Sequence, residues 1–496
     1  MTTLVAGPNV IGPAEFSGRV ARIAGGLDRV GIGDGDVVAL MLKNDPVFVE
    51  AMVATRKTGA YYCPINWHFK ADEVSYILRD SGAKLLVIHA EFLPQIEGAI
   101  PVGMPVLVVT SSNDTLPDGM TAWHKWIEEQ PAYAGPERRP RGFMPYTSGT
   151  TGRSKGVRRE PAAAEIVPRI LELNRRSYGI EQGMKTLVVA PMYHAAPNVV
   201  ALLAAISDST IVIEPRFDAE RVLSLIEQHA LDHIYLVPTL MVRLLRLPES
   251  VRRQYDLSSM RFVACTGSSC PPAVKSEMIK WWGPVIHEQY AASELGPITF
   301  ITSLEAVQKP GSAGKPMEGA LLKILDANDN EVPCGTVGTI YARQTLFPDF
   351  TYNNNDAARR AIERHGLISV GDMGYVDADG YLFVSDRASD MVISGGVNIY
   401  PAEIEHVLIG MPGVEDCAVF GIPDAEYGEA LMAAVQMCEG HVADSDAVKM
   451  FLAKRIAGYK VPRHIEFHAS LPREETGKIF KRKLKDPHWA NAGRRI

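Results

Sequence analysis

The sequence has few cysteines, and none are paired at the spacing of a metal or redox site. Its six Cys residues are spread over 496 residues without a C-x-x-C pattern. Such scattered thiols argue against a disulfide framework and against a zinc ribbon. We therefore expect buried, reduced thiols. The six are Cys63, Cys265, Cys270, Cys334, Cys417 and Cys438.

Long hydrophobic runs, a basic N-terminal stretch and an excess of positive charge are absent as well. The longest apolar runs, such as Val199–Ile206, are too short to span a bilayer. The first residues, MTTLVAGPNVIGP, lack the features of a secretory signal. A formal charge of −7 gives no hint of a nucleic-acid partner. We expect a cytoplasmic enzyme that acts on small molecules and has no membrane span. Its candidate oligomeric state is a homodimer.

What the chain does have is apolar residues in strand and helix patterns. With 46% apolar residues it has material for a large core and for two or more domains. Between two predicted strands, Asp218 is a plausible N-cap for an amphipathic helix. Strand–helix alternation of this kind predicts α/β layers with largely parallel sheets. The predicted buried strands lie in Thr186–Pro191, Thr210–Pro215, His233–Pro238 and Arg261–Gly267.

The character of the sequence changes twice towards the C-terminus. Asp326–Arg343 is typical of turns and antiparallel strands, which predicts a small β-subdomain. A polar seam at Ser385–Asp390 precedes a compact module of helices and strands. We expect a large N-terminal domain of parallel-rich αβ layers over residues 1–388 and a small α+β C-terminal domain over residues 389–496.

The segment YTSGTTGRSKGVRR, Tyr146–Arg159, is rich in Gly, Ser, Thr and basic residues. A solvated surface loop and a phosphate cradle both have this composition. The common phosphate loop G-x-x-x-x-G-K-[ST] does not fit, because Ser154 replaces its second Gly and Gly156 follows Lys155. A P-loop phosphotransferase is therefore disfavoured, and the loop also lacks the G-x-G-x-x-G of dinucleotide folds.

Four further stretches follow this loop in a suggestive order: Glu288–Gly296, Gly371–Arg387, Ser394–Glu405 and Leu471–Leu484. The ordered set resembles the acyl- and aryl-CoA synthetases of the acyl-adenylate-forming superfamily, which also contains peptide-synthetase adenylation domains and beetle luciferases. The resemblance covers almost the whole chain. It implies an ATP-dependent acid–CoA ligase that forms acyl-AMP, releases pyrophosphate and then passes the acyl group to the CoA thiol, with ATP, Mg²⁺ and coenzyme A taking part.

The resemblance also implies roles for individual residues. Lys478 would bridge the carboxylate and the α-phosphate, Ser293 would hold an AMP phosphate oxygen, and Glu294 would bind Mg²⁺. Asp372, assisted by Arg387, would accept hydrogen bonds from the ribose. The residues implied in ATP and AMP binding are Thr147, Ser148, Gly149, Thr150, Thr151, Gly152, Lys155, Gly267, Ser268, Ser269, Glu288, Gln289, Tyr290, Ala291, Ala292, Asp372, Arg387 and Asn398.

For the second step, the resemblance implies that the C-terminal domain is mobile and rotates. Lys478 would then leave, and Gly395 and Gly396 would line a tunnel for the pantetheine arm, since a backbone without Cβ lets a thin ligand pass closely. Tyr193 and His194 would flank the acyl pocket and the approach of the thiol, although an isolated histidine is more often an ordinary core residue.

Three positions depart from the common pattern of the family. Ala291 replaces a Gly, Ser293 replaces Thr, and Ser389 stands at the hinge where Asp or Lys is usual. None of these changes removes a catalytic group, but Ala291 puts the shape of the acyl pocket in doubt.

Two related activities remain open beside CoA ligation: charging of a carrier protein, and a luciferase-like oxygenase that uses the same adenylate. The segments expected to wall the acyl pocket carry almost no charge beyond His194. An amino-acid substrate would need an acidic partner for its ammonium group. The sequence therefore favours a hydrophobic fatty, aryl or polycyclic acid.

Overall fold

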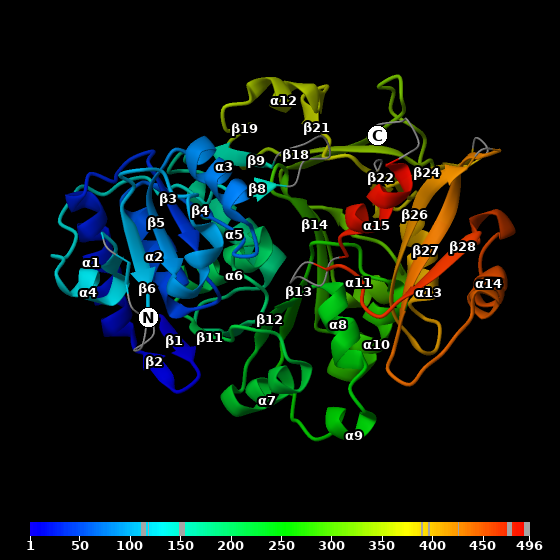
Figure 1. The fold of residues 1–496 in the computed structure, drawn as a ribbon, viewed down its shortest axis with the longest axis horizontal. Helices are drawn as coiled ribbons and strands as arrows, with labels where there is room; N and C mark the ends of the chain where they lie inside the picture. The colour runs from blue at the N-terminus through cyan, green and yellow to red at the C-terminus, as the bar shows by residue number, and fades with distance from the viewer. Residues whose placement is uncertain are drawn as a thin grey trace.

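The structure, a computed structural model, describes residues 1–110, 116–117, 119–147, 154–387, 390–394, 397–424, 426–473 and 479–490. Two large sheets form the N-terminal part of the molecule (Figure 1). The first has nine strands in the spatial order β16 (Lys315–Pro316), β15 (Gly296–Ile301), β14 (Ile286–Ala292), β13 (Phe262–Cys265), β12 (His233–Leu236), β10 (Lys185–Val188), β11 (Thr210–Ile213), β1 (Thr3–Ala6) and β2 (Asn9–Ile11).

The second large sheet has five strands, and each strand runs parallel to the strands beside it. Every residue of β3 is buried, as expected for a parallel strand covered on both faces. The spatial order is β4 (Tyr61–Pro64), β3 (Val37–Met41), β5 (Ala83–His89), β6 (Val106–Val109) and β7 (Thr121–Ala122).

Helices cover these two sheets, and one continuous apolar core joins them. Asp218 caps α7 through the Arg221 N–H (2.8 Å), as predicted, and Asp45 caps α2 in the same way. No helix in the described residues has both the length and the apolar character needed to cross a bilayer. The helices are α1 (Pro13–Arg29), α2 (Pro46–Lys57), α3 (Ala71–Ser81), α4 (Trp123–Glu128), α5 (Val167–Tyr178), α6 (Ala195–Ile206), α7 (Ala219–His229), α8 (Pro238–Leu245), α9 (Glu249–Arg252), α10 (Pro272–Trp282), α11 (Ser303–Gln308) and α12 (Asp356–Ala361).

Two smaller sheets follow, and they confirm the predicted antiparallel region. Strands β17 (Ala320–Leu325) and β18 (Gly338–Gln344) pair antiparallel within a six-stranded sheet. A three-stranded sheet contains β19 (Phe350–Tyr352), β9 (Lys155–Arg159) and β8 (Tyr146–Thr147). The other strands of the six-stranded sheet are β20 (Glu363–Arg364), β21 (Leu367–Ile368), β22 (Asp372–Val376) and β23 (Leu382–Arg387).

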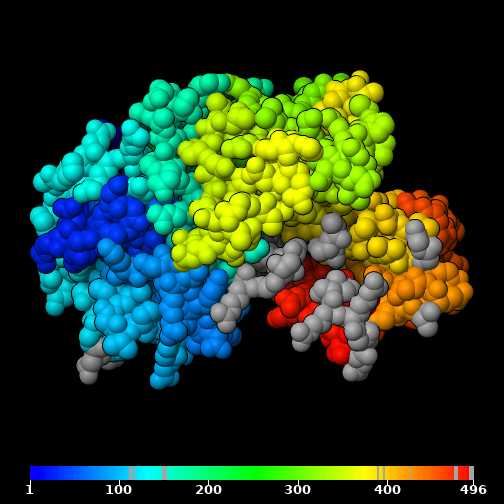
Figure 2. All heavy atoms as spheres, turned by 90° about the horizontal axis from the view of Figure 1, so that it is seen from above, coloured from blue at the N-terminus to red at the C-terminus, as the bar shows by residue number. Residues whose placement is uncertain are grey.

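The C-terminal part has its own five-stranded sheet and its own core. In Figure 2 its orange and red atoms lie at the side of the molecule opposite the N-terminal blue. The chain changes sheets between β23 and β24, where we predict the domain boundary at 388/389. The elements are β24 (Val392–Ser394), β25 (Val397–Ile399), α13 (Pro401–Leu408), β26 (Val414–Asp424), β27 (Gly428–Met437), α14 (Ser445–Ala453), β28 (His464–His468) and α15 (Lys481–Trp489).

The cysteines correct one expectation. All six are free thiols, and Cys63, Cys265, Cys270 and Cys417 are buried, but Cys334 is exposed and Cys438 is half-buried. Cys334 lies in the turn before β18, where the chain passes over the surface between two paired strands.

Candidate active site

A cavity of about 2700 Å³ lies where several parallel strands of the nine-stranded sheet end. The segments after β10, β12 and β13 line it, together with the end of β14, because the carboxyl ends of parallel strands meet at one edge. The six-stranded sheet, α13 and the start of α15 complete its wall.

This cavity gathers the predicted site residues. Of those within the described part of the chain, all but one line it. They are Thr147, Lys155, Tyr193, His194, Gly267, Ser268, Ser269, Glu288, Gln289, Tyr290, Ala291, Ala292, Ser293, Glu294, Asp372 and Arg387.

The exception is Asn398, an exposed residue that pairs with Ile393 in the β24–β25 hairpin and is not part of the cavity wall. Several other predicted residues fall outside the described residues, although Ser154 and Ile479, which follow two of these segments, do line the cavity. They are Ser148, Gly149, Thr150, Thr151, Gly152, Ser389, Gly395, Gly396 and Lys478.

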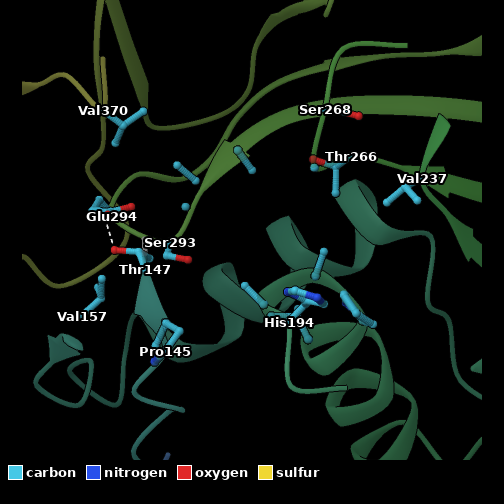
Figure 3. A pocket seen from close by; sticks show the side chains of 18 of the residues that line it. Pro145, Thr147, Val157, His194, Val237, Thr266, Ser268, Ser293, Glu294 and Val370 are labelled. Carbon is cyan, nitrogen blue, oxygen red and sulfur yellow. Dashed lines mark hydrogen bonds between the residues drawn. The ribbon is translucent and has the colours of Figure 1, made fainter. Parts of the chain in front are cut away.

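Glu294 is held at the cavity by two hydroxyls. Thr147 Oγ1 donates to its Oε1 at 3.0 Å, as Figure 3 shows, and the Tyr352 hydroxyl donates to the same oxygen at 3.1 Å. Burial, followed by the nearby Glu294 charge, raises the pKa of Tyr352, so that its hydroxyl stays a donor. Oε2 accepts no hydrogen bond from the described residues and remains available to a ligand.

The backbone that carries Ser293 and Glu294 is fixed by Arg159 of β9. Its guanidinium donates to the Ser293 carbonyl at 3.2 Å and also to the Glu294 carbonyl. Burial lowers the pKa of Arg159 to about 10, which keeps the side chain charged near neutrality. The Lys155 ammonium lies 5.1 Å from the centre of the Tyr352 ring, a cation–π distance.

Asp372, the first residue of β22, is buried and bound from two sides. The Tyr290 hydroxyl donates to its Oδ2 at 2.7 Å, and Arg387 Nε lies 3.4 Å from its Oδ1. Burial and then the Asp372 charge raise the pKa of Tyr290. These contacts tie the nine-stranded sheet to the six-stranded sheet across the cavity.

Glu288 lies in the wall but its carboxylate is engaged. It forms a buried ion pair with Lys275 of α10, and its Oε1 accepts the Cys270 N–H at 3.3 Å. These two contacts fix the loop 266–270 between β13 and α10. Within that loop Gly267 has φ of +97°, in the left-handed region that favours glycine.

On the opposite side of the cavity, His194 stands at the N-cap of α6, and its ring centre lies 4.3 Å from that of Tyr193. Figure 3 places His194 below Thr266, apart from the Thr147–Glu294 pair. The cavity therefore has a polar end near Glu294 and a further region along α6.

Sequence reasoning missed Tyr352, Arg159 and Lys275. Tyr352 lies on β19 and Arg159 on the neighbouring strand β9. The two strands pair antiparallel, with Phe350 of β19 opposite Arg159. The chain carries no motif around Tyr352 that would have revealed it. Arg159, in contrast, closes the very segment that was predicted to bind phosphate.

Residues 6–347 match the family described as AMP-binding enzyme, and residues 403–478 match the AMP-binding enzyme C-terminal domain. The chain therefore belongs to the AMP-binding enzymes. It is 33% identical to a feruloyl-CoA synthase from Amycolatopsis sp over 477 aligned residues. This alignment covers 94% of this chain and 92% of that protein.

Two other relatives agree. The long-chain-fatty-acid–CoA ligase FadD13 of Mycobacterium tuberculosis is 31% identical over 483 residues, covering 96% of this chain and 93% of that protein. The crystal structure of anthranilate CoA ligase AuaEII in complex with anthranoyl-AMP matches with a TM-score of 0.86 at 27% identity, covering 99% of this chain and 95% of the other. Within its family, the chain is an acyl-CoA synthetase that joins a carboxylic acid to CoA with ATP.

Proposed function

We propose that the enzyme works through an acyl-AMP intermediate and that its acid is hydrophobic. The observation that carries the proposal is the gathering of Thr147, Glu294, Tyr290 and Asp372 at one end of a cavity that is also lined by apolar side chains of α6 and α8. The anthranoyl-AMP bound in the similar ligase supports such an intermediate.

In the first step, a carboxylate oxygen of the acid attacks the α-phosphorus of ATP, and pyrophosphate leaves. Asp372, with Arg387 beside it, receives the ribose hydroxyls, and Tyr290 lies against the adenine. We expect the segment from Thr147 to Lys155 to bind the departing phosphates. Fixed donors and cations aimed at this crowded negative charge lower the barrier. Lys478 stays our prediction for the cation at the α-phosphate.

Magnesium fits Glu294 by its chemistry. Mg²⁺ prefers hard oxygen ligands and is usually held by one or two carboxylates with phosphates and water. No group of three or more His, Cys, Asp or Glu that could hold a metal occurs among the described residues. Oε2 of Glu294, which accepts no hydrogen bond from the described residues, is then the protein's contribution, and the ion would neutralise phosphate charge.

In the second step, the CoA thiol attacks the acyl carbonyl and AMP leaves, giving the thioester. We expect the C-terminal domain, residues 389–496, to rotate between the steps and to bring Gly395 and Gly396 to the pantetheine arm. Tyr193 and His194 flank the path of the thiol.

The hydrophobic acid is supported by the wall formed by α6 and α8. It contributes Ala196, Val199, Leu202, Leu203, Ile206, Val237 and Val242 to the cavity. Burial of two or more methylene groups at about 0.8 kcal/mol each favours such acids by about tenfold or more. The names of the feruloyl and long-chain relatives point to the same class.

One assay tests the whole proposal. The protein is incubated with ATP, Mg²⁺, CoA and a panel of acids, and AMP, ADP, pyrophosphate and thioester are quantified. Octanoate, benzoate or cinnamate should give at least about tenfold more thioester than acetate or glycine. ADP in place of AMP would overturn the adenylate, and equal turnover of acetate would overturn the hydrophobic acid. Transfer to a phosphopantetheinyl carrier protein, with none to CoA, would change the acceptor.

A further inference from the structure

The side chain of Gln289 is polar and buried, and neither of its polar atoms makes a hydrogen bond of ordinary distance and angle with the described residues. It lies on β14 and is 4% exposed. An unsatisfied buried polar group costs about 1–3 kcal/mol. A protein retains such a group at a functional site when a ligand satisfies it.

Gln289 and the nucleotide-side residue Tyr290 point to different faces of β14. Side chains alternate along a strand, so Gln289 points to the face opposite Glu288 and Tyr290, which bind Lys275 and Asp372. Gln289 also lines the cavity. Its amide is therefore directed away from Tyr290 and Asp372. The resemblance had placed Gln289 with the nucleotide, and we reassign it to the acid.

A second polar side chain stands beside it. Tyr178, the last residue of α5, lines the same cavity. Burial raises the pKa of Tyr178 to about 12, and the neighbouring Gln289 amide opposes that shift. Tyr178 is thus a neutral phenol next to the amide. Asn174, one helical turn earlier, also lines the cavity.

The surroundings of this polar pair are apolar. Ile170 and Leu171 of α5 and Leu202 and Ile206 of α6 line the same cavity. An acid that is apolar along its whole length would bury the Gln289 amide against carbon.

We propose that Gln289, together with Tyr178, recognises a hydroxyl group at the far end of the acid, and that the substrate is a hydroxyaryl carboxylic acid. The inference rests on the proposed function, whose acyl site it specifies. A hydroxyl both donates and accepts, and the amide offers both an acceptor oxygen and a donor nitrogen. An acid without the hydroxyl leaves the amide unsatisfied, which is the situation in which enzymes discriminate strongly.

Matched acid pairs test the inference on the intact enzyme with ATP and CoA. The pairs are 4-hydroxycinnamate with cinnamate, and 3-(4-hydroxyphenyl)propanoate with 3-phenylpropanoate. We expect kcat/KM to be at least about tenfold higher for the hydroxylated member of each pair. Equal or higher values for the unsubstituted members would overturn the inference and leave the ligase function standing. Failure of every acid to yield AMP and thioester would overturn the proposed function itself.

The variant Gln289→Met assigns the preference to this residue. Methionine has a similar volume and no hydrogen-bonding amide, so the preference should fall to about threefold or less, mainly through loss of the hydroxylated acids. The matched control is Gln130→Met, because Gln130 is equally buried but donates to the Trp126 carbonyl at 2.8 Å and lies outside the cavity wall. Its preference should equal that of the wild type.

A thermal midpoint separates recognition from support of the wall. If Gln289 binds the ligand and does not stabilise the fold, Gln289→Met removes an unsatisfied buried amide. The midpoint of thermal unfolding of the ligand-free enzyme should then stay unchanged or rise. A preference that survives in Gln289→Met, or a midpoint that falls by several degrees with no change of preference, would overturn the role of Gln289.

Discussion

At the scale of single residues, the carboxylate of Glu294 has its orientation fixed by side chains from two other strands. Thr147 on β8 and Tyr352 on β19 both donate to Oε1. Two donors on one oxygen restrict rotation of the carboxylate and leave Oε2 for a ligand. Tyr352 is thus a positioning residue for Glu294.

We expect Tyr352→Phe to lower kcat/KM for ATP by about tenfold, because a hydrogen bond to a charged group contributes about 1.5–3 kcal/mol and Thr147 retains part of the effect. The Mg²⁺ concentration for half-maximal rate should rise in the same variant. Initial rates over an ATP and Mg²⁺ matrix measure both.

Tyr381→Phe is the matched control for this change. The Tyr381 hydroxyl donates to Glu305 at 3.2 Å, and Tyr381 is not part of the cavity wall. Its kinetics should equal those of the wild type. If Tyr352→Phe also behaved as the wild type, the hydrogen bond to Glu294 would have no part in ATP use.

Asp372→Asn should raise the KM for ATP by at least about tenfold, since the ribose would lose a charged acceptor and Arg387 its counter-ion. Asp326→Asn serves as control, because Asp326 is a half-buried turn residue outside the cavity wall that accepts the Asn328 and Asn330 N–H groups. An unchanged KM for ATP in Asp372→Asn would refute the assignment to the nucleotide.

Single residues were predictable where a short motif carried them. Tyr290 and Glu294 stand within nine residues, and Asp372 and Arg387 belong to one hairpin, so local sequence identified all four. Tyr352, Arg159 and Lys275 were missed because each reaches the site through a tertiary contact that no local pattern encodes.

At the scale of elements, a buried histidine connects β12, β10 and α5. His233 Nε2 lies 2.7 Å from the Tyr178 carbonyl, which can only accept, so Nε2 carries the proton. Nδ1 lies 2.6 Å from the Thr186 hydroxyl. Complete burial lowers the pKa of His233 to about 4, so the ring is neutral in the folded protein.

This histidine should make the fold sensitive to acid. Its pKa is lower in the folded state than in the unfolded chain, where it is about 6.5, so its stabilising contribution is complete above pH 6.5. The contribution is lost as the pH falls from 6.5 towards 4, because the unfolded chain then binds the extra proton. Between pH 7 and pH 5 the loss is about 2 kcal/mol.

Urea unfolding of the wild type, His233→Gln and His365→Gln at pH 7 and pH 5 measures this loss. His233→Gln should show a pH dependence smaller by about 2 kcal/mol. The exposed His365, whose ring contacts the Asp329 carbonyl, serves as the matched control. Identical pH dependence in all three proteins would contradict the prediction.

Elements were predictable in type but not in order. The four apolar runs that end in Pro or Gly are the strands β10, β11, β12 and β13, and α7 lies where Asp218 indicated its start. No local pattern indicated that Thr3–Ala6 pairs with β11, because this pairing joins segments about 200 residues apart.

At the scale of the whole molecule, the C-terminal part is attached to the rest by polar contacts. Arg246, at the end of α8, donates to the Val414 carbonyl at 2.8 Å. Asp386 on β23 accepts the Ala402 N–H of α13 at 2.8 Å, so the segments on both sides of the predicted hinge are held. Polar interfaces of this kind permit relative motion more readily than large apolar ones.

If the C-terminal domain changes orientation between the two steps, the contact between Arg246 and Val414 belongs to one orientation only. In that orientation, residues 479–483, which directly follow Lys478, line the cavity. We therefore assign the contact to the adenylation step. Arg246→Met keeps the apolar stem of the side chain and removes the hydrogen bond.

We expect Arg246→Met to slow adenylation by about five- to tenfold, as measured by pyrophosphate exchange, because a charged hydrogen bond that is partly exposed contributes about 1–1.5 kcal/mol. Thioester formation from supplied acyl-AMP should remain within about twofold of the wild type. Arg252→Met is the control, since the Arg252 guanidinium lies 5.3 Å from the centre of the Trp281 ring, within the N-terminal part. Equal losses in both half-reactions would mean that Arg246 acts on a step common to both orientations, and its contact with Val414 would then have no part in selecting between them.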